Sequence, residues 1–298
     1  MTIAADRVAH ATVQLRGPLD IPLSVSGLGR WGDDGIDRWD GARMLRSVRV
    51  AGVPVPYRAV PGGSIDAPSL ELTAPAAMLD RVGHTARSSF ARADAALDDL
   101  VAQDRAVAHA AERFPGVRPL LHPDPLTALV RSISAQQINL RWAAVIRRRL
   151  AERYGRRLDV DGEPVWSLDA ALLAAAHPDD LRALQFTYRK GLSIIAVAEW
   201  VLDGRLERPD LDRMDDEEVI ALLVQLPGIG RWSAEWFLAR TLGRPVVVAG
   251  DLGVRKAVGA AYLEGRMPSE PEVRSITAHW GDAAGVAQQL LLHALNAP

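Results

Sequence analysis

One glycine-containing segment constrains the fold of this chain more than any other: Leu226-Pro227-Gly228-Ile229-Gly230-Arg231-Trp232-Ser233-Ala234. The residues before it predict an amphipathic helix, because Asp215 and Glu218 have the spacing of a capping box ahead of an apolar stripe. Pro227 ends that helix, and the two glycines permit a tight turn into a second one. The first amides of the second helix then lack partners and lie at the positive end of its dipole. We therefore predict a helix–hairpin–helix that binds a phosphate through its backbone; a plain connection between helices is the alternative.

The two parts of the chain differ in their hydrophobic pattern. Residues 1–88 carry short alternating or β-branched runs separated by Gly- and Pro-rich turns, which predict a small, β-rich α+β domain. From about Ser88, apolar residues recur at helical spacing, so residues 89–298 are predicted to form an all-helical domain. The expected fold class is therefore α+β.

The absence of cysteine excludes disulfides, thiolate zinc sites and iron–sulfur clusters. No apolar run is long enough to cross a bilayer, and the first ten residues do not have the pattern of a signal peptide. We therefore expect a cytoplasmic protein with no membrane partner.

The distribution of charge says more than the net charge of −2. Residues 113–160 hold ten arginines against three acidic residues, a local charge of +7, whereas residues 205–218 hold three arginines against seven acidic residues, or −4. A basic region on a nearly neutral protein can bind phosphates. A solvated helix surface is the other interpretation.

The hairpin resembles that of the helix-hairpin-helix-GPD superfamily of DNA glycosylases, in which an essential aspartate follows about twenty residues later. Asp251 stands 21 residues after Gly230. Residues 131–138 are similar to the segment with which these enzymes fill the gap left by a flipped base, and residues 184–191 to a turn before a helix that lines the site. Arg231-Trp232 and the extra N-terminal domain are similar to the 3-methyladenine DNA glycosylase II (AlkA) type.

This resemblance implies a base-excision-repair enzyme with two helical lobes and the active-site cleft between them. Its partner would be double-stranded DNA that contains a damaged base, and we expect a monomer. The superfamily's iron–sulfur loop cannot be built without cysteine, so no cofactor is expected. A monovalent cation that bridges hairpin carbonyls to the phosphate is implied by the resemblance; no other metal is expected.

Asp251 is the candidate catalytic carboxylate. The buried base must be flipped out before the bond between the base and C1′ can break. A carboxylate beside C1′ can stabilise the oxocarbenium-like transition state and orient the attacking water. Asp251 is the single acidic residue in residues 244–263. It could equally be the N-cap of a helix that begins at Leu252, and the two roles are compatible.

Trp232 stands where bifunctional relatives carry the lysine that attacks C1′, so the resemblance implies simple hydrolysis. It also places Trp232, Trp236 and Leu252 at the base pocket. Since the two tryptophans are spaced i, i+4, core packing is the alternative. An aromatic wall would favour cationic alkylated purines such as 3-methyladenine.

Gln136 and Gln137 are the candidate DNA wedge, with an exposed pair at a helix junction as the alternative. The chain departs from the AlkA pattern in the stretch Trp280-Gly281-Asp282-Ala283-Ala284-Gly285, where a second Trp and an Arg are missing, and at Ala249 and Leu252. These departures concern the base pocket, so a glycosylase for deaminated bases (hypoxanthine or uracil) is an alternative. Two further alternatives are a catalytically silent DNA-binding protein, which would not need Asp251, and a helical protein-interaction domain, which would leave the hairpin and the basic region without a role.

Overall fold

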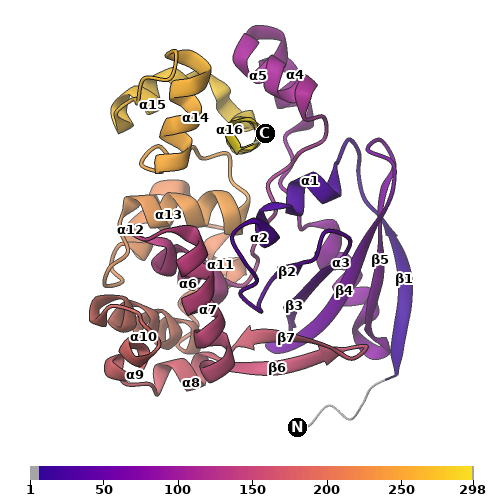
Figure 1. The fold of residues 1–298 in the computed structure, drawn as a ribbon, viewed down its shortest axis with the longest axis vertical. Coiled ribbons are helices and arrows are strands. Elements are labelled where there is room, and N and C mark those ends of the chain that lie inside the picture. Colours follow the sequence, from indigo (N-terminus) through magenta and orange to yellow (C-terminus); the bar gives the residue numbers. More distant parts are fainter. Residues whose placement is uncertain (1–6, 297–298) are drawn as a thin grey trace.

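The computed structural model describes residues 7–296, so residues 1–6 and 297–298, at the outer ends of the two predicted domains, lie outside the described residues. Figure 1 shows a twisted sheet on one side of the molecule and a column of helices beside it. The predicted α+β class is confirmed. Within residues 7–296, no helix has the length and apolar character needed to cross a membrane.

The N-terminal part is a five-stranded antiparallel sheet in the order β1-β5-β4-β3-β2. Its strands are β1 (Val8–Gln14), β2 (Arg38–Trp39), β3 (Met44–Val50), β4 (Val53–Gly63) and β5 (Pro68–Pro75). Its helices are α1 (Ile21–Val25), α2 (Gly27–Arg30), η1 (Ala76–Met78) and α3 (Leu79–Arg87). Helix α3 packs on the sheet, and Val13, Leu72 and Val82 are buried between them.

The helices form two lobes with separate apolar cores. The first lobe contains α6 (Pro125–Ala135), α7 (Leu140–Tyr154), α8 (Ala170–Ala174), α9 (Pro178–Ala183), α10 (Tyr188–Leu202), α11 (Arg208–Leu211), α12 (Asp216–Leu223), α13 (Arg231–Phe237) and the π-helix η2 (Leu238–Leu242). The second contains α4 (Asp94–Gln103), α5 (Arg105–Arg113), α14 (Leu252–Tyr262), α15 (Glu270–Thr277), η3 (Ala278–Ala283) and α16 (Ala284–Asn296). Figure 1 shows α4 and α5 at the top beside α14 and α16, so the second lobe joins the two ends of the helical part.

The prediction of an all-helical C-terminal part was wrong in one place. Strands β6 (Gly155–Val160) and β7 (Glu163–Leu168) form an antiparallel hairpin inside the first lobe. Asp161 and Gly162 connect them with φ values of 56° and 80°, and Asp-Gly is a strong signal for this turn. In the sequence, the arginines around this turn indicate only a basic surface. The β6–β7 hairpin contacts β3, β4 and β5, so it joins the first helical lobe to the sheet.

A buried ion cluster also joins the two parts. Asp37 of the N-terminal part accepts hydrogen bonds from Arg46 and from Arg131 of α6, at 2.6 and 2.8 Å. Burial alone would raise the pKa of Asp37, but Arg46 and Arg131 outweigh it and hold that pKa well below its ordinary value. Burial lowers the pKa of His122, which lies 3.1 Å from the Asp37 carboxylate, to about 4. The helix that leads to the candidate wedge is thus fixed to the sheet domain.

Candidate active site

The hairpin between α12 and α13 leaves its backbone open at one position. Gly228 has a φ of +75°, and a side chain there would collide with the Ser193 hydroxyl. Gly230 is the N-cap of α13 without a side-chain hydrogen bond, and a Cβ built on it has no neighbour within 4 Å. The backbone at Gly230 is therefore accessible, and within the described residues the first amides of α13 have no hydrogen-bond partner, as a phosphate site requires.

The side chain of Arg231 is already paired within the protein. Its guanidinium donates to Glu217 at 2.6 Å and to Glu235 at 2.9 Å. Glu235 is buried and also accepts from Arg274 of α15 at 2.7 Å. This chain of ion pairs connects the hairpin to the second lobe, so a phosphate at the hairpin would meet backbone amides rather than a free arginine.

Asp251 is the N-cap of α14 and lies where the two lobes meet. Its Oδ1 accepts from the Val254 amide at 3.0 Å, which is the cap that the sequence predicts. Its Oδ2 accepts from the indole N–H of Trp232 at 3.1 Å. Because Trp232 belongs to α13, this hydrogen bond brings the hairpin and the candidate carboxylate together. Both oxygens have a fixed orientation, and no arginine or lysine among residues 7–296 forms a hydrogen bond with the carboxylate.

The three predicted pocket residues do not form one wall. Trp232 lies against Asp251 and Gly250. Leu252 is exposed, at 56 % of its surface, beside the same carboxylate. Trp236 instead packs on the core of the first lobe and stacks on His122, with ring centroids 5.9 Å apart. Only Trp232 and Leu252 are therefore next to the candidate catalytic group.

The two glutamines of the candidate wedge have different surroundings. The amide of Gln136 donates to the Gly228 carbonyl at 3.0 Å and to the Ser233 hydroxyl at 3.2 Å, so it is attached to the hairpin. Gln137 is exposed and has a left-handed backbone, with a φ of +56°. Gln137 is consequently the tip of the loop, and Gln136 holds the loop in place.

The contacts of two basic residues beside this site were not predicted from the sequence, although Lys190 belongs to the segment 184–191 that the resemblance places there. The ammonium of Lys190 donates to the carbonyls of Gln136 at 2.7 Å and Ser134 at 3.1 Å, and burial lowers its pKa. Arg240, in the π-helix, donates to Gln289 at 2.6 Å. Burial lowers the pKa of Arg240 to about 10, against the opposing charge of Asp251. An arginine inside an otherwise apolar helix was the available signal for Arg240, since such a cation needs a partner.

Two hollows are present elsewhere on the surface, and neither is lined by Asp251 or Trp232. The larger, of about 490 Å³, lies between the segment after α2 and α7. The smaller, of about 20 Å³, lies at His122 and Asp124. Among the residues described, no group of three His, Asp or Glu side chains could hold a metal ion.

Comparison with known families gives one match, and it covers the hairpin, Asp251 and the wedge loop. The model of the HhH-GPD superfamily base excision DNA repair proteins matches residues 130–282, just over half of the chain.

Individual relatives match part of the chain. A DNA-3-methyladenine glycosylase from Bacillus subtilis is 28% identical over 172 residues, which cover 57% of each protein. DNA-3-methyladenine glycosylase 2 of Escherichia coli is 34% identical over 148 residues, 48% of this chain and 52% of that protein. The chain thus matches little more than half the length of these curated relatives. A solved 3-methyladenine DNA-glycosylase from Archaeoglobus fulgidus has the same fold over 95% of this chain and 96% of its own, with a TM-score of 0.79 and 22% identity.

Proposed function

The chain belongs to the HhH-GPD superfamily of base excision DNA repair proteins, and on that basis we propose that it is a monofunctional DNA glycosylase that removes damaged bases from double-stranded DNA. The observation that carries the proposal is the hydrogen bond from Trp232 to Asp251. This hydrogen bond orients the carboxylate beside the start of α13, where Gly230 leaves the backbone accessible, and both features support the proposal. A DNA-binding module without catalysis would not need that carboxylate.

In the proposed reaction, the bond between the base nitrogen and C1′ breaks, and the leaving base takes the bonding electrons. Positive charge develops on the sugar, and the Asp251 carboxylate stabilises it. A water molecule adds its oxygen to C1′ and loses a proton to Asp251 or to the departing base. The products are the free base and an abasic site in an intact strand. The fixed orientation of Asp251 avoids reorganisation during this step.

We propose that the hairpin holds a phosphate that flanks the flipped nucleotide, with Gly230 giving the backbone access. Gln137 would enter the space left in the duplex, while Gln136 keeps the loop attached to the hairpin. A monovalent cation at the hairpin would be held by backbone carbonyls. Two of these oxygens already accept hydrogen bonds, Leu226 O from Ile229 and Gly228 O from Gln136, and each keeps a second lone pair for a cation. We expect one monomer per lesion.

The monofunctional mechanism is supported by the two lysines of the chain. Neither stands at position 232, where the resemblance would place a Schiff-base lysine. Lys190 uses its ammonium to hold two carbonyls of the wedge segment. Lys256 lies on the exposed side of α14. The indole at position 232 cannot attack C1′.

For the substrate, we propose alkylated purines of the 3-methyladenine type, because the electron-rich ring of Trp232 beside Asp251 suits a cationic base. Arg240 favours a second candidate substrate, a deaminated base. Within the described part of the chain, this half-buried guanidinium forms no ion pair with a carboxylate, so it would repel a cationic base and could donate to the carbonyl of hypoxanthine or uracil.

A panel of duplexes with one lesion each tests the function and the substrate together. We expect single-turnover release of 3-methyladenine and 7-methylguanine by the unmodified chain and none by Asp251→Asn. Faster release of hypoxanthine or uracil than of both methylated purines, together with loss of that release in Arg240→Gln, would select the second candidate. Binding of all duplexes without release of any base would leave only a DNA-binding protein.

A further inference from the structure

The hollow of about 490 Å³ between the segment after α2 and the exposed side of α7 has no role in the proposed reaction. We call it the α7 groove. Its lining residues come from both parts of the molecule: Arg30, Trp31, Gly32, Asp33, Arg141, Ala144, Val145, Arg148, Arg149 and Glu152. Helix α7 begins three residues after Gln137, so one end of the groove lies close in the chain to the candidate wedge.

The α7 groove carries positive charge that the protein does not neutralise. Its two carboxylates are occupied, because Asp33 pairs with Arg38 at 2.8 Å and Glu152 with Arg148 at 2.9 Å. Among residues 7–296, no carboxylate forms an ion pair with the other three arginines of the groove, which are Arg30, Arg141 and Arg149. Three arginines of the groove lining are therefore available to an anion without competition from an internal carboxylate.

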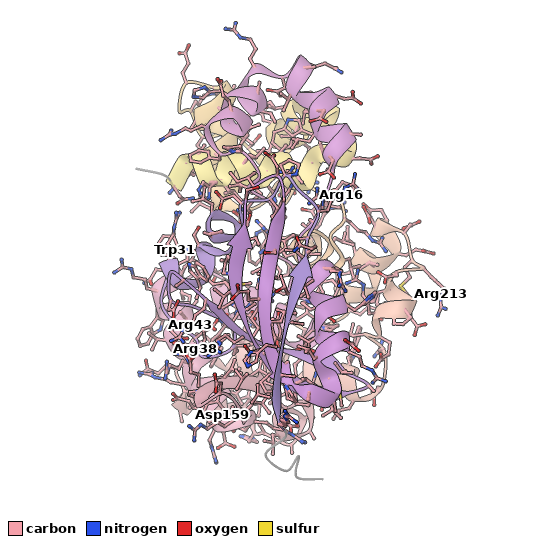
Figure 2. The ribbon with its side chains drawn as sticks, turned by 90° about the vertical axis from the view of Figure 1, so that its right-hand side faces the viewer. Arg16, Trp31, Arg38, Arg43, Asp159 and Arg213 are labelled. Atoms are coloured by element: carbon pink, nitrogen blue, oxygen red, sulfur yellow. The ribbon has the colours of Figure 1, made fainter. Side chains whose placement is uncertain are left out.

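The α7 groove also exposes flat, apolar surface. Trp31 is 37 % exposed and Val145 is 40 % exposed. Next to the groove, Trp142 is 36 % exposed, and the guanidinium of Arg149 lies 5.3 Å from the centre of its ring. Figure 2 shows Trp31 at the left margin of the molecule, on the side opposite Arg213. The exposed indole of Trp31 thus shares the groove with arginines that have no carboxylate partner, so the groove offers both a stacking surface and charge.

We propose that the α7 groove binds single-stranded DNA, with a base stacked on Trp31 and the adjoining phosphates on Arg30, Arg141 and Arg149. The combination of an aromatic ring with a basic groove is what single strands need, because their bases are free to stack. A duplex backbone offers only phosphates and would leave the indole unused. The inference rests on the proposed function in one respect, namely that the partner of this chain is DNA.

Fluorescence anisotropy with a labelled thymidine octamer, dT8, tests the groove directly. We expect Trp31→Ala to bind dT8 about tenfold more weakly, since stacking on one aromatic ring is worth that much. Trp31→Phe retains an aromatic ring and should keep most of the affinity. Arg141→Glu and Arg149→Glu should each weaken binding and reduce the slope of log K against log salt by about 0.7 for each phosphate that the variant no longer neutralises. Arg213→Glu, on the opposite side, makes the same charge reversal, so it is the matched control for the two arginine variants and should bind normally.

Two results would overturn the proposal. One is equal affinity of Trp31→Ala and the unmodified chain for dT8. The other is equal affinity of the unmodified chain for dT8 and for an abasic octamer of the same charge, which would reduce the groove to a phosphate contact. Thermal unfolding of each variant identifies any that fails to fold.

The test is independent of base excision. Trp31→Ala should release damaged bases from duplex DNA at the unmodified rate, and Asp251→Asn should bind dT8 normally. If the unmodified chain released no base from any duplex but lost dT8 binding on Trp31→Ala, the proposed function would be refuted and the groove would stand. Normal base release by the unmodified chain, together with unchanged dT8 binding in Trp31→Ala, would refute only the proposal that the α7 groove binds single-stranded DNA.

Discussion

The indole N–H of Trp232 donates a hydrogen bond of 3.1 Å to the Oδ2 of Asp251. Trp232 lies in the first turn of α13 in the first lobe, and Asp251 is the N-cap of α14 in the second lobe. The bond therefore fixes the hairpin and the carboxylate relative to each other across the junction of the lobes.

Asp251→Asn should abolish base release while the fold and DNA binding survive. Asparagine is as good an N-cap as aspartate, so the bond to the Val254 amide can be kept. Loss of the charge removes the stabilisation of the developing positive charge on the sugar, and we expect at least a roughly hundredfold slower single-turnover rate. Affinity for duplex DNA, measured in parallel, is the control. Release within tenfold of the unmodified chain would contradict the role of Asp251.

Borohydride added during turnover should trap no covalent protein–DNA adduct. A trapped adduct requires an amine on C1′, and Lys190 is held by two carbonyls of the wedge segment. The assay is an electrophoretic shift with labelled duplex, and a known glycosylase/lyase serves as the positive control. An adduct that disappears in Lys190→Arg or Lys256→Arg would replace the monofunctional mechanism with a lyase.

Substitution of the two glutamines should have different effects, with Gln136 affecting the stability of the protein and Gln137 affecting its action on DNA. Gln136→Ala removes two hydrogen bonds to the hairpin, so we expect it to lower the free energy of unfolding by about 1–2 kcal/mol. Gln137→Ala should leave stability nearly unchanged and slow base flipping, because Gln137 is the exposed tip. Chemical denaturation and stopped-flow fluorescence of a base analogue measure the two effects. The reverse pattern would assign the wedge to Gln136.

The two hairpin glycines should also behave differently. Gly230→Val adds its side chain at a position where a Cβ has no neighbour within 4 Å, so the fold should survive while binding of every duplex weakens alike, whatever the lesion. Gly228→Ala places a side chain against the Ser193 hydroxyl at a positive φ and should destabilise the protein by about 1 kcal/mol or more. Thermal unfolding and anisotropy on lesion-free DNA distinguish them. If Gly230→Val affected one lesion only, the hairpin would belong to the base pocket.

Acid should destabilise the protein through His122. Its pKa is about 4 in the folded chain against 6.5 for a free histidine, so between pH 6.5 and 4 the unfolded chain binds a proton that the folded chain does not. Stability is therefore lost as the pH falls through this window, by up to roughly 3 kcal/mol. His122→Gln keeps a donor for Asp37 and should flatten the pH dependence of the unfolding free energy there. An unchanged slope would show that other groups dominate.

The sequence predicted the parts that depend on local patterns. The hairpin, the cap at Asp251 and the change from strands to helices each follow from neighbouring residues, and the structure contains all three. The contacts of distant residues did not follow. Nothing local connects Arg231 to Glu217, or Gln136 to the Gly228 carbonyl. Trp236 lies four residues after Trp232, so the sequence places both on one side of a helix. Its stacking on His122, however, depends on a segment more than a hundred residues away.

The second lobe is built from helices that lie far apart in the sequence, and this affects how the chain can fold during synthesis on the ribosome. Leu97 and Val107 belong to helices made early, but their core partners Val254 and Leu290 are made last. While the intervening 140 or so residues emerge and fold, α4 and α5 lack the partners that α14, η3 and α16 supply to their apolar sides. Nascent chains that stall before α16 should consequently contain a folded sheet and first lobe with an incomplete second lobe. Such chains would be targets for chaperones and proteases until the last helix arrives.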